Sequence, residues 1–185
     1  STGRGGSSPT GRLTVPDRWL ISRHQACVAE VDAALDSYLF AEAAQAIYRF
    51  LWSEFCDWSL EMQKGRLDGE DADRQDAANV LAWVLERTLR LLHPVMPFVT
   101  EEIWQRFGAG ESVVVAPWPE RHEEHLFAEE PGVEGGFRVL RDVITRIRQA
   151  RSDYEIPQQT RLRLVISPGP LQLLVEEYQD SVCRM

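Results

Sequence analysis

Lysine is almost absent from this sequence of 185 residues: 19 of its 20 basic residues are arginine, and Lys64 is the only exception. Chemistry that depends on a catalytic lysine is therefore nearly excluded. A positive charge excess is also missing, because the formal net charge is −9. The chain thus lacks the general positive field of a non-specific nucleic-acid binder. Any contact with RNA must be local, and arginine suits it because its planar guanidinium stacks on bases and bonds phosphates in a forked geometry.

Cysteine is scarce and scattered. Cys27, Cys56 and Cys183 lie far apart and form no Cys-x-x-Cys pair, so neither a disulfide framework nor a zinc site is indicated. We expect buried, reduced thiols in a cytoplasmic protein. No apolar run reaches the roughly 18 residues that span a bilayer, and no signal peptide is recognisable, so no membrane contact is expected.

Motifs of known catalytic sites are missing as well. The sequence has no Gly-rich phosphate loop, no nucleophile elbow and no Glu-x-x-His pair of the kind that holds two metal ions in a helix bundle. His122 and His125 are three residues apart, but in a loop rich in Pro and Glu, and His24 and His93 are expected at the surface or the core edge. We therefore predict no catalytic residue, no metal and no cofactor in this chain.

Changes in composition along the sequence divide the chain into four predicted parts. Residues 1–16 are rich in Gly, Ser and Thr and resemble a flexible linker or a cloning remnant, and the start at Ser1 suggests a piece of something longer. Residues 17–119 carry helical patterns, and residues 120–136 form an acidic loop. Residues 137–185 predict a small α+β extension that is cut short, with a helix over 137–152, a strand over 162–166 and a helix over 171–178.

Apolar residues recur at helical spacing through the second part. The first helix is predicted from Asp17, its N-cap, to about Ser37, and the second over about residues 40–67. A third helix is predicted to end at Leu92, and a fourth, after the proline corner, to end near Gly108. The second is the longest, with Trp58 at the crossing of its apolar rows, where we expect it in the core. Short connections between such helices are typical of an up-and-down bundle, so the predicted fold class is mainly α.

Two prolines separate the third and fourth helices. Pro94 ends one helix, and Pro97 has the backbone angle suited to the first turn of the next. Glu101 and Glu102 are expected in that first turn, where the helix dipole favours carboxylates. After this bundle the β-branched run Val113–Val115 predicts a short extended segment.

Four motifs together resemble one family. Residues 92–104 fit the Leu-x-Pro-x-x-Pro-(Phe/His)-x-x-Glu-Glu-(Ile/Leu)-Trp pattern of the anticodon-binding domain of class Ia aminoacyl-tRNA synthetases. Residues 17–23 are similar to the Asp-Arg-Trp opening of that domain. Residues 55–61 are most like the Phe-Cys-Asp-Trp-Tyr-Leu-Glu sequence of valyl-tRNA synthetases, although Ser59 replaces the tyrosine, and residues 114–119 also fit the valyl pattern. The resemblance covers about residues 17–166.

The resemblance implies the tRNA-reading part of a valyl-tRNA synthetase. This family carries its catalysis in a nucleotide-binding domain with His-x-Gly-His and Lys-Met-Ser-Lys-Ser signatures, and neither occurs here. By implication the chain itself catalyses nothing, ATP and Mg²⁺ belong to the parent enzyme, and the partners are the anticodon loop of tRNA(Val) and the parent's catalytic domain, not DNA. Two alternatives stay open: the same domain of an isoleucyl-tRNA synthetase, and a free-standing helical module for protein interaction or regulation.

In this family the anticodon lies near the first helix, the start of the second and the fourth. That implies base or phosphate contacts by Arg23 and stacking by Phe40, although Phe40 and Trp104 also fit the apolar stripes and are more simply core residues. The arginines of residues 138–151 either hold the RNA backbone or are merely solvated. The complete set of candidate tRNA-binding residues is Arg23, Phe40, Ile103, Trp104, Arg106, Arg141 and Arg148.

Overall fold

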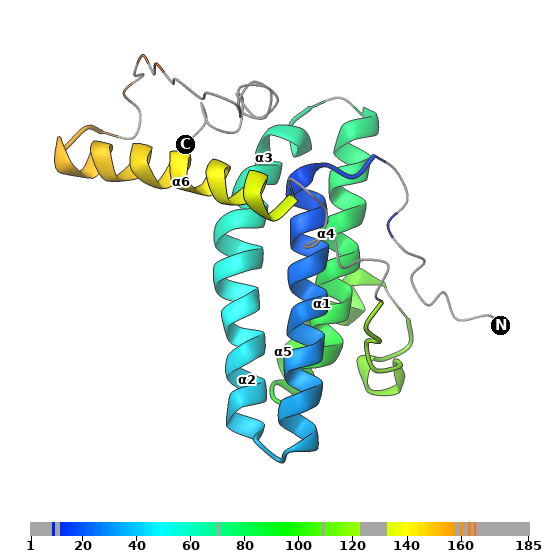
Figure 1. Cartoon of the computed structure of the whole chain (residues 1–185). Helices are drawn as coiled ribbons and strands as arrows, with labels where there is room; N and C mark the ends of the chain where they lie inside the picture. Colours follow the sequence, from blue (N-terminus) through cyan, green and yellow to red (C-terminus); the bar gives the residue numbers. More distant parts are fainter. Residues whose placement is uncertain are drawn as a thin grey trace.

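The computed structural model describes residues 9, 12–69, 71–108, 110–122, 133–157, 160, 163 and 165, and within them the chain is helical, with no strand. Figure 1 shows α1, α2 and α4 side by side and α6 crossing one end of the bundle. The mainly helical prediction is confirmed. The predicted strand over 162–166 and helix over 171–178 lie almost wholly outside the described residues. The elements are α1 (Val15–Asp36), α2 (Phe40–Arg49), η1 (Phe50–Leu60), α3 (Glu61–Leu67), α4 (Asp71–Leu92), α5 (Pro97–Phe107), η2 (Val113–Val115) and α6 (Val133–Asp153).

Helix α1 begins earlier than predicted. Thr14, not Asp17, is the N-cap, and Asp17 occupies the third helical position of a capping box. The Thr14 amide donates to the Asp17 carboxylate over 2.9 Å, and the Thr14 hydroxyl accepts from the Asp17 amide. This reciprocal pairing satisfies two amides at the start of the helix, which is why the helix reaches back to Val15.

The buried carboxylate of Asp17 also joins α1 to α3. It is completely buried and accepts from the Arg66 guanidinium over 2.7 Å, and from the side-chain amide of Gln63. Arg66 in turn bonds Asp73 near the start of α4 over 2.8 Å. A buried carboxylate needs such partners to remain charged, so this cluster fixes three elements at one end of the bundle.

The long helix predicted over 40–67 is continuous but not uniform. Its central part, η1, is π-helical, with α2 before it and α3 after it. The Ser59 hydroxyl donates to the carbonyl oxygen of Glu54, five residues earlier, over 2.9 Å, which matches the wider π-helical spacing. Ser59 is buried, so the small side chain that departs from the family motif fits a site with little room.

The proline corner between α4 and α5 has the predicted form. Pro97 is the first residue of α5, and Gly108 ends it in the left-handed conformation, with φ of 66°. Glu101 and Glu102 lie after the first turn, so their predicted place was wrong. Glu101 instead accepts from the Ser112 hydroxyl over 2.9 Å and the Val113 amide over 3.1 Å. These bonds hold the start of Val113–Val115, which forms the 3₁₀ turn η2. The predicted extended segment was therefore wrong.

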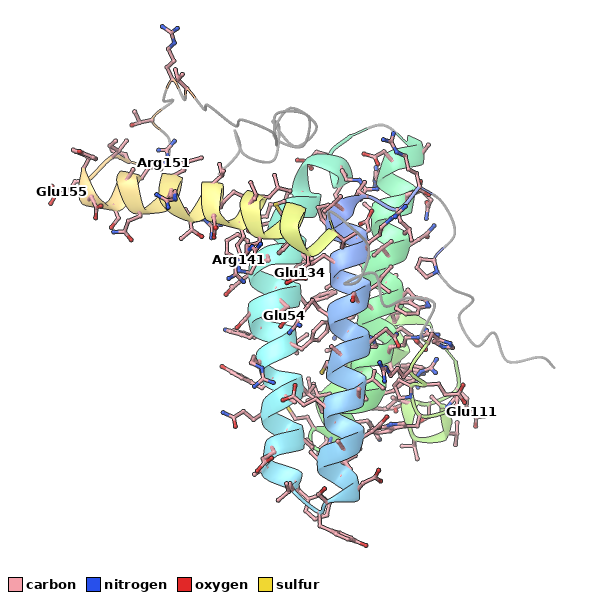
Figure 2. All side chains as sticks on the ribbon, in the orientation of Figure 1. Glu54, Glu111, Glu134, Arg141, Arg151 and Glu155 are labelled. Carbon is pink, nitrogen blue, oxygen red and sulfur yellow. The ribbon has the colours of Figure 1, made fainter. Side chains whose placement is uncertain are left out.

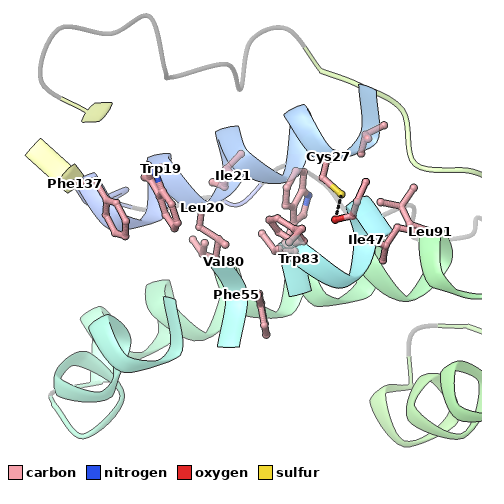
Figure 3. Close-up of a cluster of buried hydrophobic side chains, with 14 of the residues drawn as sticks. Trp19, Leu20, Ile21, Cys27, Ile47, Phe55, Val80, Trp83, Leu91 and Phe137 are labelled. Carbon is pink, nitrogen blue, oxygen red and sulfur yellow. Dashed lines mark hydrogen bonds between the residues drawn. The ribbon is translucent and has the colours of Figure 1, made fainter. Parts of the chain in front are cut away.

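Helix α6 shares the core of the bundle. It begins at Val133, four residues before the prediction, and buries Phe137, Leu140 and Ile144 in the main apolar cluster. The rings of Trp19 and Phe137 stack with centroids 3.6 Å apart, as Figure 3 shows. Whether residues 17–119 and 137–185 are separate domains stays a prediction, but this helix is anchored to α1.

His24 lies inside this core, contrary to the surface or core-edge position predicted for it. It has no exposed surface, and the rings of Phe50 and Trp83 surround it in edge-on contacts with centroids 5.4 and 5.9 Å away. Neither ring nitrogen has a hydrogen-bond partner among the described residues. Burial, helped by the positive charge of Arg87, lowers the pKa of His24 to about 3. The ring is therefore neutral at physiological pH.

Two other predictions concern chemistry and membranes. Cys27 is buried and Cys56 half-buried, both as free thiols, and Cys183 lies outside the described residues. None of the described helices is long and apolar enough to cross a bilayer.

Candidate nucleic-acid interface

A pocket opens where α6 meets α1 and η1, with a volume of about 430 Å³. Figure 2 labels Glu54, Glu134 and Arg141 at this junction. We call it the arginine pocket, because arginine is its commonest residue. It is lined by Trp19, Arg23, Arg49, Ser53, Glu54, Trp58, Glu134, Phe137, Arg138 and Arg141. Its four arginines and two glutamates leave a formal charge of +2, on a chain whose total is −9.

Two of the four arginines are neutralised by neighbours. Arg23 donates two bonds of 2.8 Å to the carboxylate of Glu54, and this hydrogen bonding raises the pKa of Arg23. Arg49 bonds the carboxylate of Glu30 over 2.7 Å. Arg23 therefore does not present a free guanidinium, although its side chain is 42% exposed.

The other two arginines come from α6. Arg138 and Arg141 are exposed and have no ion-pair partner among the described residues. They are three positions apart on one helix, so their side chains leave the same face. Glu134, about one helical turn before Arg138, carries the remaining negative charge of the lining, so these two guanidinium groups supply the excess positive charge of the pocket.

Trp58 forms a wall of the pocket and was predicted wrongly as a full core residue. It is half-buried and packs edge-on against Phe137, with centroids 6.5 Å apart. The guanidinium groups of Arg141 and Arg148 lie 5.8 and 5.6 Å from its ring centroid. The structure thus brings Arg23, Arg141 and Arg148 of the predicted set to one region, at the junction of α6 and η1.

Phe40 lies elsewhere, at the turn between α1 and α2. Its side chain is 64% exposed, so it is not the core residue that its place in the apolar stripe favoured. Tyr38 is 80% exposed and Leu39 45%, and the rings of Tyr38 and Phe40 meet edge-on with centroids 6.4 Å apart. We call these three residues the aromatic tip. Asp36 lies 13 positions after Arg23 on α1, which corresponds to roughly 20 Å, so pocket and tip are distinct.

Tyr38 has an unusual backbone. Its φ is 58°, in the left-handed region where glycine normally ends a helix. The amides of Tyr38 and Leu39 donate to the carbonyl oxygens of Leu35 and Ala34 over 2.9 and 2.8 Å, which closes the last turn. A bulky residue costs energy there, and this one is exposed and supplies nothing to the core. Sequence reasoning missed Tyr38; the signal was an apolar run, Tyr-Leu-Phe, placed in a turn.

Three predicted residues lie on α5. Trp104 is only 2% exposed and packs with Leu89 and Val113, so it is a core residue, and no base can reach its ring in this structure. Ile103 is 36% exposed, and Arg106 is exposed and paired with Glu102 over 2.8 Å. The α5 residues therefore offer an apolar edge and one neutralised arginine.

The aromatic tip and the proline corner share one end of the bundle. Helices α1 and α4 run in the same direction, and α2 runs back along the other side of α1, so the end of α1 and the end of α4 lie toward the same side in Figure 1. The corner exposes further apolar side chains, of which Phe98 is 88% exposed. Val95 and Met96 are about half exposed. Phe98 was also missed: its motif was interpreted as a helix start and as part of the family resemblance, and no contact was assigned to this residue.

The described residues contain no group of three or more His, Cys, Asp and Glu side chains that could hold a metal ion. Exposed aromatic rings at one end and free guanidinium groups at the other are instead the features used to stack bases and to bond phosphates.

Comparison with known proteins gives a consistent answer. The family described as "Anticodon-binding domain of tRNA ligase" matches residues 17–166. The valine–tRNA ligase of Halalkalibacterium halodurans is 40% identical over 182 residues, which are 95% of this chain and 20% of that protein. The corresponding enzymes of Staphylococcus carnosus and Fervidobacterium nodosum are 41% and 42% identical, over 93% and 90% of this chain and 20% and 19% of theirs. The chain spans about a fifth of the length of these curated relatives.

Proposed function

The chain belongs to the family of anticodon-binding domains of tRNA ligases, and on that premise we propose that it binds the anticodon loop of tRNA(Val) for a valine–tRNA ligase. The relatives are about five times as long, which supports a division of labour in which another domain activates valine with ATP and Mg²⁺ in the cytoplasm. In this proposal the chain positions the tRNA and contributes no catalytic group. Its protein partner is the catalytic domain of the parent enzyme.

The aromatic tip is the observation that carries the proposal. Valine codons begin with guanine and uracil, so the anticodon has adenine in the middle and cytosine third. Bases that leave a loop are held by stacking on aromatic rings, worth about 1–3 kcal/mol per base. Phe40 is exposed at the start of the second helix, and Tyr38 is held beside it in a strained backbone. Such strain in an exposed aromatic residue indicates a functional demand.

The test is a titration of labelled anticodon stem-loops. We expect the loop with adenine in the middle and cytosine third to bind better than loops with either base changed. Phe40→Ala should weaken the matched loop by roughly 5- to 100-fold, since one stacked base is lost. Tyr48→Ala is the matched control, because Tyr48 is 63% exposed on the same helix, two turns away. Equal affinity for all loops, unchanged by Phe40→Ala, would contradict anticodon recognition and favour a protein-interaction module.

The third anticodon base separates the valyl from the isoleucyl proposal. Isoleucine codons begin with adenine and uracil, so the matching anticodon also has adenine in the middle but uracil third. A loop with uracil third is therefore the sharpest competitor. Preference for cytosine supports the valyl assignment, which agrees with the names of the relatives, and preference for uracil would overturn it.

A further inference from the structure

The arginine pocket is separate from the aromatic tip, because Arg23 on its wall lies roughly 20 Å from the end of α1. We propose that it binds a phosphate of the RNA backbone, held by Arg138 and Arg141. This inference rests on the proposed function, since it assumes that RNA is the ligand, but it concerns a second site on the same chain. Nothing in the stacking of anticodon bases requires it.

Charge is the first argument. The residues that line the pocket have a formal charge of +2, whereas the net charge of the whole chain is −9. The pocket is therefore a locally positive site on an acidic molecule. Glu54 and Glu30 already hold Arg23 and Arg49, and within the described residues Glu134 forms no ion pair with either remaining arginine, so the groups able to bind a new anion are Arg138 and Arg141. Two guanidinium groups on one helix face can donate several hydrogen bonds to one phosphate, which a single arginine cannot do as tightly.

Shape is the second argument. A volume of about 430 Å³ exceeds what one phosphate needs and is typical of sites for small organic groups. Trp58, on the wall, already carries Arg141 and Arg148 at cation–π distance, so an aromatic face lies beside the phosphate position. A ribose or base attached to the phosphate can rest against this wall. The pocket therefore suits a nucleotide unit better than a bare inorganic anion.

Rigidity is the third argument. The floor of the pocket is the stacked pair of Trp19 and Phe137, which are 4% and 2% exposed. Arg138 follows Phe137 directly, and Arg141 follows the buried Leu140, so both guanidinium groups extend from a helix that is anchored at each step. A pre-formed site loses little freedom on binding.

The test compares two double variants of equal charge. Arg138→Gln with Arg141→Gln removes the proposed phosphate ligands, whereas Arg74→Gln with Arg121→Gln removes two exposed arginines outside the pocket and outside α6. We expect the first to weaken matched and mismatched stem-loops alike, by about 10-fold, and to make the slope of log affinity against log salt shallower by about 1 for each lost phosphate contact. The control should change neither quantity by more than a small factor.

The outcomes separate this inference from the proposed function. If wild-type chain fails to discriminate between loops, but the pocket variant still binds RNA more weakly than the control, the phosphate site stands while anticodon recognition falls. If discrimination is present and both double variants bind equally well, the phosphate site is wrong, and a protein segment remains the alternative occupant. Unchanged urea midpoints, expected because all four side chains are exposed, ensure that folding does not explain the difference.

A free nucleotide is the other source of the same chemistry. Adenosine monophosphate should compete with the labelled stem-loop only at concentrations at least 100-fold above the RNA. This is because a single unit lacks the contacts at the aromatic tip. Competition at equal concentration would show a nucleotide-binding pocket and would overturn the assignment to RNA.

Discussion

Trp19 of α1 and Phe137 of α6 lie face to face, with ring centroids 3.6 Å apart and planes inclined by 11°. Both side chains are buried, and Trp58 meets the edge of Phe137 from η1. Three elements thus converge on one phenyl ring. The position of α6, and with it the arginine pocket, depends on this contact.

Phe137→Ala should therefore cost roughly 3–5 kcal/mol in the free energy of unfolding, the usual range for removing a buried aromatic ring. Urea denaturation followed by circular dichroism measures the change. Phe98→Ala is the matched control, because Phe98 is 88% exposed and its loss should leave stability nearly unchanged. Equal urea midpoints for the two variants would mean that α6 is not docked on α1.

Tyr38→Gly should have two opposite effects. Glycine adopts the left-handed backbone without steric cost, so the variant should be more stable by up to about 1 kcal/mol. Loss of the ring should at the same time weaken binding of the anticodon stem-loop. Tyr38→Ala separates the causes, since it removes the ring and keeps the strain. A Tyr38→Gly chain that binds RNA like the wild type would show that the strained tyrosine serves no RNA contact.

Arg66→Ala should be strongly destabilising, by about 3–5 kcal/mol, because it leaves the carboxylate of Asp17 buried without a cation. Arg74→Ala, at an exposed position of α4, provides the comparison and should stay within about 0.5 kcal/mol of the wild type. Adding Asp17→Asn to Arg66→Ala should recover part of the loss. Failure to recover any of it would mean that the buried charge is not the cause.

His24 predicts a dependence of stability on pH. Its pKa is about 3 in the folded chain, against 6.5 when exposed, so only the unfolded chain gains a proton between these values. Stability is therefore full above pH 6.5 and falls as pH is lowered toward 3, by up to about 1.4 kcal/mol per pH unit from this group. His24→Leu should flatten that part of the profile. A variant with the same slope between pH 6.5 and 5 as the wild type would assign the loss to other groups.

The helices could be predicted closely because their evidence is local. The apolar spacing of residues 40–67 and the two prolines at 94 and 97 act through neighbouring residues, and both predictions match the structure. The family motifs are likewise patterns of residues adjacent in the sequence. The burial of a side chain that depends on one helix packing against another was harder to predict. Trp58 occupies a core position of its own helix, but its neighbour α6 covers only one side of it.

The candidate site shows the same limit. Arg23 fits an RNA contact by sequence, but its partner Glu54 comes from a different helix, 31 residues away. The burial of His24 depends on Phe50 and Trp83, from two other helices. Thr14 was not predicted as the N-cap because threonine and aspartate are both common N-cap residues, and Asp17 was chosen. The reciprocal hydrogen bonds of the capping box in the structure identify Thr14 as the N-cap.

The π-helical turns of η1 determine the rotation of the following helix, α3, about its axis. A π-helical turn holds more residues than an α-helical turn, so returning Phe50–Leu60 to α-helical form with all its residues kept would rotate α3 around its axis. Gln63 and Arg66 would then turn away from Asp17, while Tyr48, upstream in α2, would keep its place. The π-helical winding of this segment is thus a constraint separate from the composition of its exposed face.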